Sequence, residues 1–188
     1  MKRGCTGWVA GLSAVLTGLL AGCEAKHEDL TQKTVYTGPL VESNNVLMIF
    51  SDSAKLQAKL TAPLQQQFES GDMVFPKTLK ITFYGDNGAR IINTLEGNYG
   101  KYDKNQNLFT VRGKVKVRNE EKHQQLNTEE LFFNRQKGTI FTAKETAVRV
   151  ETDTEVLTGF GLEANQEFSR YKIFKPTGIF TVQQPDQK

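Results

Sequence analysis

Alternation of apolar and polar residues dominates the sequence that follows Gly38-Pro39. The alternation is clearest in three segments, at residues 56–62, 79–84 and 109–118. Successive side chains of a β-strand point to opposite faces, so this period indicates strands with one buried face and one face in water. We find no convincing helical period in this part of the chain. The pattern therefore predicts a protein built from half-buried strands.

Turn signals separate these strands at short intervals. Groups of Gly, Asn, Asp and other polar residues lie at residues 85–88, 103–107, 119–121, 135–138 and 152–153. Strands of about six residues with turns roughly every ten residues are typical of all-β sandwiches, barrels and jelly rolls.

A weak internal repeat refines this expectation. Leu95-Glu96-Gly97, Leu126-Asn127-Thr128 and Leu157-Thr158-Gly159 recur at a spacing of 31 residues. A repeat this short cannot enclose its own core, so successive repeats must stack. The predicted fold is a stacked-repeat β-jelly roll of two facing antiparallel sheets, open at the ends. The alternative is that three leucines coincide by chance in a chain rich in strands.

The N-terminus has the features of an export signal. Lys2 and Arg3 precede an uncharged apolar stretch at residues 8–21, which is shorter than the roughly 20 residues that span a bilayer. The stretch ends in Leu20-Ala21-Gly22-Cys23, which resembles the lipobox of bacterial lipoproteins. We expect residues 1–22 to be removed and Cys23 to be acylated, which anchors the protein to a membrane outside the cytoplasm. The alternative is an ordinary signal peptide with a chance cysteine.

The processed chain would consist of an anchored tether and one domain. Residues 23–37 are mostly polar and are expected to link the lipid anchor to a domain at residues 38–188. The only cysteines are Cys5, within the signal, and Cys23. No disulfide can then form in an oxidising compartment, and the fold must depend on its core.

Charge and motifs argue against several classes of function. After removal of residues 1–22, 22 basic residues face 21 acidic ones, without the excess of positive charge typical of a nucleic-acid binder. His27 and His123 have no neighbouring ligands for zinc, and nucleotide-binding and nucleophile motifs are absent. The adjacent Glu129 and Glu130 are expected to point to opposite faces of a strand, so they make a poor acid–base pair. We expect a protein without enzymatic activity, cofactor or metal.

Several segments resemble the LptC family, the periplasmic component of the lipopolysaccharide export machine. The resemblance covers nearly all of residues 38–182, and its most specific segments are Leu126–Leu131 and Gly159–Ala164. The other similar segments are Gly38–Val41, Phe50–Leu56, Phe75-Pro76, Thr82–Tyr84 and Gly113–Asn119, together with Lys175 and Gly178.

The resemblance implies a twisted β-jelly roll whose apolar interior accepts the acyl chains of lipopolysaccharide. It also implies two partners, an inner-membrane ABC transporter at one end and a periplasmic β-jelly-roll bridge protein at the other. Family members of this kind use a transmembrane helix as anchor, whereas this chain offers Cys23. The resemblance favours the inner membrane. However, the residue after Cys23 is Glu24, whereas Asp at this position favours retention in the inner membrane. Attachment to the outer membrane is therefore the alternative.

Two sets of residues follow as candidate sites. Strand parity predicts that one set faces the interior and contacts acyl chains in transit: Phe83, Ile92, Val115, Val117, Leu126, Ile140, Val148 and Leu157. The last predicted strand offers a free edge to a partner chain, at Gly178, Ile179, Phe180, Thr181 and Val182.

Two other functions fit the same pattern. One is a lipid-anchored structural or protein-interaction module with a solid core, since an apolar inner face is what any β-sandwich contains. The other is a lipid carrier with a closed pocket. A hollow interior that is open at an end would favour lipid transfer over both.

Overall fold

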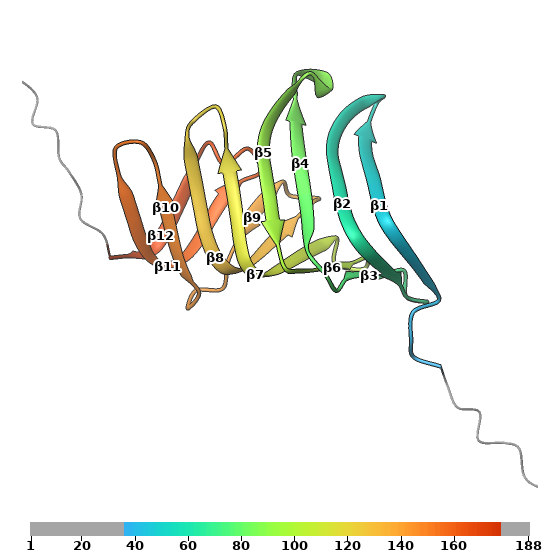
Figure 1. Ribbon diagram of the computed structural model, residues 1–188. Coiled ribbons are helices and arrows are strands. Elements are labelled where there is room, and N and C mark those ends of the chain that lie inside the picture. The colour runs from blue at the N-terminus through green and yellow to red at the C-terminus, as the bar shows by residue number, and fades with distance from the viewer. Residues whose placement is uncertain (1–35, 178–188) are drawn as a thin grey trace, which may run out of the picture. The chain divides into compact units, whose positions relative to one another are not determined.

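A computed structural model describes residues 36–177, and in this range the protein consists of antiparallel strands with one short 3₁₀ turn (Figure 1). The elements are β1 (Val41–Asp52), β2 (Lys55–Gln67), β3 (Met73–Phe75), β4 (Leu79–Gly85), η1 (Asp86–Gly88), β5 (Arg90–Gly97), β6 (Tyr99–Asp103), β7 (Leu108–Asn119), β8 (Gln124–Asn134), β9 (Thr139–Phe141), β10 (Ala147–Glu151), β11 (Val156–Asn165) and β12 (Tyr171–Pro176). The predicted all-β, antiparallel class is confirmed. Within residues 36–177, no helix is long and apolar enough to cross a membrane.

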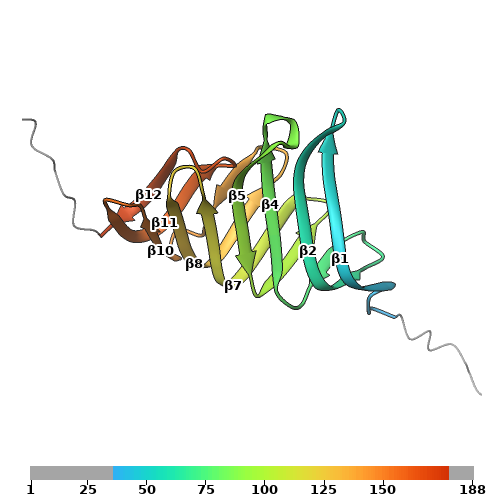
Figure 2. The same ribbon diagram turned by 45° about the horizontal axis from the view of Figure 1, so that its top comes forward.

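The strands form two layers that share several members. In the first layer, neighbours pair in the order β1-β2-β4-β5-β7-β8-β10-β11. In the second layer, the order is β2-β3-β6-β7-β8-β9-β11-β12. Figures 1 and 2 show β1, β2, β4 and β5 side by side in the first layer.

The two layers belong to one hydrogen-bonded network and are not separate sheets. Strands β2, β7, β8 and β11 each bend and pair in both layers. The pairings of β2, β4, β5, β7, β6 and β3 return to β2, so these six strands close a ring. The jelly-roll description of this arrangement stays a prediction.

The bends occur where the backbone leaves normal strand geometry. In β7, the register shifts between Arg112 and Val115, and Gly113 and Lys114 both have positive φ, at 76° and 50°. In β11, Gly161 has a φ of 70°. Glycine adopts this conformation without a steric penalty from Cβ, so it allows a strand to turn from one layer into the other.

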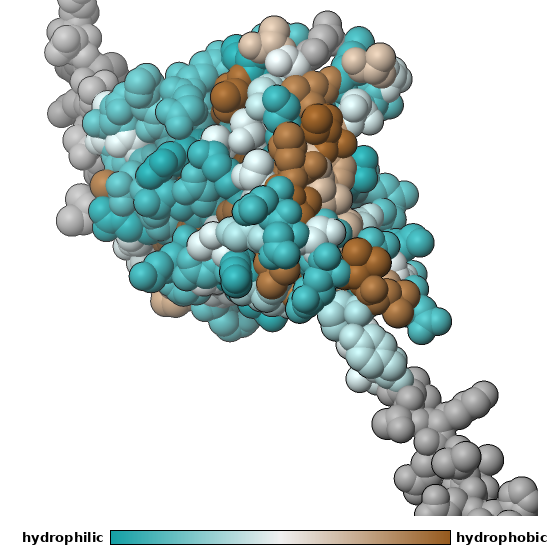
Figure 3. All heavy atoms as spheres, turned by 45° about the vertical axis from the view of Figure 1, so that its right-hand side comes forward, coloured by the Kyte–Doolittle hydropathy of each residue, from teal (hydrophilic) through white to brown (hydrophobic). Residues whose placement is uncertain are grey.

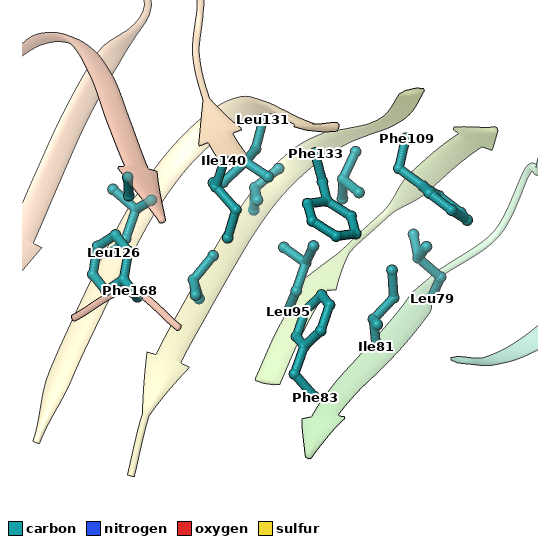
Figure 4. Close-up of a cluster of buried hydrophobic side chains, with 14 of the residues drawn as sticks. Leu79, Ile81, Phe83, Leu95, Phe109, Leu126, Leu131, Phe133, Ile140 and Phe168 are labelled. Atoms are coloured by element: carbon teal, nitrogen blue, oxygen red, sulfur yellow. The ribbon is translucent and has the colours of Figure 1, made fainter. Parts of the chain in front are cut away.

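Side chains from both layers fill the interior. The largest fully buried ones include Leu60, Phe75, Leu95, Leu126, Leu131, Ile140, Leu162 and Phe168. Figure 4 shows several members of this core, among them Leu95, Leu126 and Phe168. The repeated leucines Leu95, Leu126 and Leu157 lie on β5, β8 and β11. Leu95 and Leu126 are fully buried, whereas Leu157 is partly buried and packs against the core.

Candidate functional site

A cavity of about 180 Å³ lies between the two layers. Strands β1, β2 and β4 of the first layer and β7 and β8 of the second contribute its walls. The apolar walls are formed by Phe50, Ala58, Ile81, Phe83, Phe109 and Phe133. The polar groups at its border are Asp52, Gln57, Arg135 and Gln166.

Aromatic rings from opposite layers meet in this cavity. Phe83 of β4 contacts Phe133 of β8 edge to face, with 5.5 Å between the ring centroids. Phe50 of β1 contacts Phe109 of β7 in the same way at 6.5 Å. Phe83, Phe109 and Phe133 are buried, whereas Phe50 is only half-buried. The cavity therefore has an apolar surface that is partly accessible on the β1 side, where Figure 3 shows apolar atoms between polar ones.

A positive charge lies at the border of the cavity. The guanidinium carbon of Arg135 lies 5.2 Å from the centre of the Phe50 ring, within the range of a cation–π interaction. Arg135 is exposed and follows β8 directly, in the turn to β9. The arrangement suits a ligand with an apolar chain and an anionic group.

Two larger hollows lie near the bend of β7. They measure about 650 and 640 Å³ and share Lys114 and Lys116. The first contains the ion pair of Lys80 and Glu96, at 3.0 Å. The charged groups of the first hollow would have to lose water to contact an apolar chain, which is unfavourable. The aromatic cavity is therefore a better site for a hydrocarbon chain than the first hollow, although it is smaller. The second hollow has a mainly apolar wall, which includes Val115, Val148 and Phe160.

Most of the predicted interior residues lie in the core. Phe83, Val115, Val117, Leu126, Ile140 and Val148 are buried. Leu157 is partly buried and packs against them. Only Phe83 among the eight predicted residues lines the aromatic cavity. Burial is what a filled core also requires, so lipid contact by the other residues stays a prediction.

Ile92 differs from the other seven residues. The register between β4 and β5 shifts after Phe83, so that Asn93 lies opposite Phe83 while Ile91 lies opposite Tyr84. Ile92 is half-buried at this bulge and lies outside the core cluster, and the fully buried position next to it belongs to Asn93. Simple strand parity fails here because a bulge inserts an extra residue.

Several residues of the cavity do not belong to the set of interior residues that strand parity predicts. Phe109 belongs to an alternating segment and could have been found by parity. Phe133 follows Phe132, so parity alone could not decide which of the two faces the interior. Phe50 and Arg135 lie near turns, and only the pairing of distant strands brings them together.

Two other predicted sites lie outside the described residues. These are the acylation site at Cys23 and the partner edge at residues 178–182. Thr177, just before that edge, donates its backbone N–H to the carbonyl oxygen of Thr158 at 2.7 Å. Strand β12 pairs with β11 alone among the described strands.

The described part of the chain offers no group of three His, Cys, Asp or Glu side chains that could hold a metal. The aromatic cavity is suited to binding rather than to acid–base chemistry, because its two charged groups, Asp52 and Arg135, lie at its border.

Comparison with known proteins identifies a related family. The family model described as "Lipopolysaccharide-assembly, LptC-related" matches residues 9–175. This match spans most of the chain and covers the described strands from β1 to Lys175 in β12. No curated protein matches the sequence.

Proposed function

Because the chain belongs to the LptC-related family of lipopolysaccharide-assembly proteins, we propose that it is a non-enzymatic lipid-transfer component in the periplasm. In this proposal it accepts lipopolysaccharide from an inner-membrane ABC transporter and passes it to a periplasmic β-jelly-roll bridge protein. The family takes part in lipopolysaccharide transport. The aromatic cavity between the layers is the single observation that best supports the finer role.

The energetics of acyl chains explain why such a cavity is useful. Exposing a chain of a dozen carbons to water costs on the order of 10 kcal/mol, at about 0.8 kcal/mol per methylene. The rings of Phe50, Phe83, Phe109 and Phe133 can replace that water, and Arg135 can attract an anionic headgroup at the border. A volume of about 180 Å³ is smaller than a typical ligand pocket. It therefore suits part of a lipid in transit, which a deep and tight site would trap.

The solid-core module is the main competing function. It is favoured by the dense packing around Leu126, Leu131 and Ile140, which are fully buried. A closed-pocket carrier is less favoured, because Phe50 on the wall of the cavity is half-buried rather than enclosed.

A pair of adjacent phenylalanines provides the test of lipid contact. A photo-reactive residue in place of Phe133 is expected to crosslink lipopolysaccharide in cells with an active transporter, because Phe133 lines the cavity. The same residue in place of Phe132 is the matched control. Phe132 stacks on Phe141, at 5.3 Å, away from that cavity. The measurement is the mass shift of the crosslinked protein, detected with an antibody against lipopolysaccharide.

The interior residues Val115 and Leu126 serve as further probe positions, with the outward Lys116 as their control. Each variant must keep the melting temperature of the parent, so that exposure by unfolding does not imitate lipid contact. Absence of lipid crosslinks from all interior probes, in folded protein, would replace lipid transfer with the solid-core module.

The proposed edge at residues 178–182 makes a separate prediction about partners. A photo-crosslinker at Thr177 or Thr181 is expected to capture the periplasmic bridge protein, because a free strand edge presents unpaired N–H and C=O groups. Thr181→Pro removes one backbone donor and should lower the yield of that crosslink. A crosslinker at Gln136, an exposed turn residue, is the control. Crosslinks from the edge that contain only this protein would contradict the role of the edge.

A further inference from the structure

The turn between β11 and β12 joins two strands of the second layer and contacts strands of the first layer. We call this turn, residues 166–170, the strap. The side-chain amide of Asn93 on β5 donates to the carbonyl oxygen of Gln166 at 2.8 Å. The side-chain amide of Asn119 on β7 donates to the carbonyl oxygen of Glu167 at 3.1 Å. Strap and first layer are therefore joined by side-chain hydrogen bonds rather than by a strand ladder.

A third bond lies at the surface. The ammonium group of Lys122, in the turn after β7, donates to the carbonyl oxygen of Ser169 at 3.4 Å. Two of the donors lie on strands of the first layer and the third lies in the turn after β7, and all three acceptors are carbonyl groups of the strap. The strap is thus fixed at one side by polar contacts that can break one at a time.

Phe168 points from the strap into the interior. Its side chain is fully buried in the same core cluster as Leu126 and Ile140 (Figure 4). Its φ is 53°, a conformation that a bulky side chain rarely adopts. Such strain persists when surrounding contacts hold it in place. The strap contacts therefore keep an aromatic side chain in a position that the local backbone alone would not favour.

Tyr171 supports Phe168 from the start of β12. The two rings stack, with 5.3 Å between their centroids. Burial raises the pKa of Tyr171, and the carboxylate of Glu155 raises it further. The phenol is therefore neutral at physiological pH and acts as an apolar support.

The strap lies at the border of the aromatic cavity, because Gln166 is one of the residues that line it. Phe168, two residues later, belongs to the buried cluster that also contains Leu126. An acyl chain that extended from the cavity into this cluster would have to displace side chains that fill it, and Phe168 is the one that the strap carries.

We propose that the strap is a releasable latch in which Phe168 occupies the position of an acyl chain. Lipid that advances from the aromatic cavity displaces Phe168, and the strap returns when the lipid has passed. This inference rests on the proposed lipid-transfer function, because it assumes that acyl chains enter the aromatic cavity.

Two features make release of the strap feasible. First, Asn165 holds the turn together internally. Its carbonyl oxygen accepts the N–H of Phe168 at 2.8 Å, and its side-chain oxygen accepts the N–H of Arg170 at 2.9 Å. The strap can then move as a unit while these bonds persist.

Second, the closed latch leaves one polar atom unsatisfied. Among the described residues, the side-chain oxygen of Asn93 is buried without a hydrogen-bond partner. An unsatisfied buried acceptor is unfavourable. Opening would expose this oxygen to water or to a hydroxyl group of an incoming lipid. The hydrogen bond formed there would offset part of the loss of the bond from Asn93 to Gln166.

Asn119→Asp tests the latch selectively. The side-chain oxygen of Asn119 accepts the N–H of Lys122 at 2.8 Å, and Asp keeps this bond. It removes the donor to Glu167 and places an anion beside that carbonyl group. Asn134→Asp is the matched control, because the side-chain oxygen of Asn134 accepts the N–H of Lys137 at 2.9 Å in a similar turn. Lys122→Ala is a milder variant that removes only the exposed bond to the strap.

Two measurements on the purified full-length protein report the result. The first is hydrogen exchange of the amide of Gln166, which donates to the carbonyl oxygen of Gly138 at 2.9 Å and is released when the strap moves. This exchange is expected to rise about tenfold in Asn119→Asp, as for loss of one buried hydrogen bond. The second is photo-crosslinking of added lipopolysaccharide from probes at Phe133 and at Leu126. Asn119→Asp should raise crosslinking at Leu126 several-fold and leave crosslinking at Phe133 unchanged. Lys122→Ala should act in the same direction, more weakly, and Asn134→Asp should match the parent.

The outcomes separate the latch from the proposed function. Lipid crosslinks at Phe133 with no change at Leu126 or in strap exchange would refute the latch and leave lipid transfer intact. No lipid crosslinks at either position in any folded variant would refute lipid transfer itself. If Asn119→Asp lowers the melting temperature strongly, Lys122→Ala decides the result.

Discussion

Replacing Cys23 with alanine is expected to leave the whole population of the protein as an unprocessed precursor. In the proposed lipoprotein pathway, the thiol of Cys23 receives the diacylglyceryl group, and cleavage after Gly22 requires that modification. Alanine offers no thiol to which the diacylglyceryl group could be transferred, so both lipid attachment and cleavage should fail together. Intact-mass measurement of the membrane and soluble fractions checks both steps, because the parent lacks residues 1–22 and carries the added lipid.

Cys5→Ala is the control for this experiment. It removes the other cysteine of the chain and lies within the segment that is expected to be discarded. Its mature form should therefore have the same mass and membrane attachment as the parent. A Cys23→Ala protein that matures to the parent's protein mass and stays with the membrane would contradict the lipid anchor. Stable attachment requires more than one acyl chain, and Cys23 is expected to carry the whole lipid group. Loss of this single residue should therefore abolish lipid attachment completely.

The sequence predicts the strands well because half-buried strands leave a local signal. The alternating segments at residues 56–62, 79–84 and 109–118 lie in β2, β4 and β7. One face of each strand is buried and the other faces water, so the alternation along the strand is enough to predict which side chains are buried. The turn signals likewise mark most of the hairpin ends, since Gly, Asn and Asp favour the backbone conformations of tight turns.

The bends between layers are harder to predict, because they depend on pairing between distant segments. On β8, the inward residues are Leu126 and Thr128 before the bend, but Leu131 and Phe133 after it. The parity changes within one strand, opposite the bulge of β7. Lys114 adopts a positive φ there, although its side chain gives no local preference for that conformation. Because of these bends, single strands pair in both layers, and the two layers form one hydrogen-bonded network.

The residues of the aromatic cavity are hard to predict for the same reason. Phe83 could be selected from its own strand, whereas Phe50, Phe109 and Phe133 acquire their common role only when β1 and β4 lie over β7 and β8. Phe168 lies in a turn rich in polar residues, so neither hydrophobic period nor turn chemistry predicts its burial. Its place depends on Asn93 and Asn119, which precede it by 75 and 49 positions in the printed sequence.

Truncation of Leu126 should cause one of the largest losses of stability in the domain. Leu126→Ala removes a fully buried side chain and is expected to lower the free energy of unfolding by about 3 kcal/mol, because lost burial adds to the cost of a cavity. Leu157→Ala, at the next repeat position, should cost roughly half as much, since Leu157 is only partly buried and its site can relax toward solvent. Urea-induced unfolding of the processed protein measures both values.

The comparison between the two leucines also tests the core around the strap. Leu126 and Phe168 belong to one buried cluster, so Leu126→Ala leaves unfilled space within the cluster that holds Phe168. Asn127→Ala, the neighbouring substitution with an outward side chain, should change the free energy of unfolding by less than about 0.5 kcal/mol. Equal losses for Leu126→Ala and Leu157→Ala would contradict the unequal burial of the two repeat positions. A loss near zero at Leu126 would mean that the interior around β8 is loosely packed. Lipid could then reach Leu126 without release of the strap, so the same unfolding curve bears on how the interior opens.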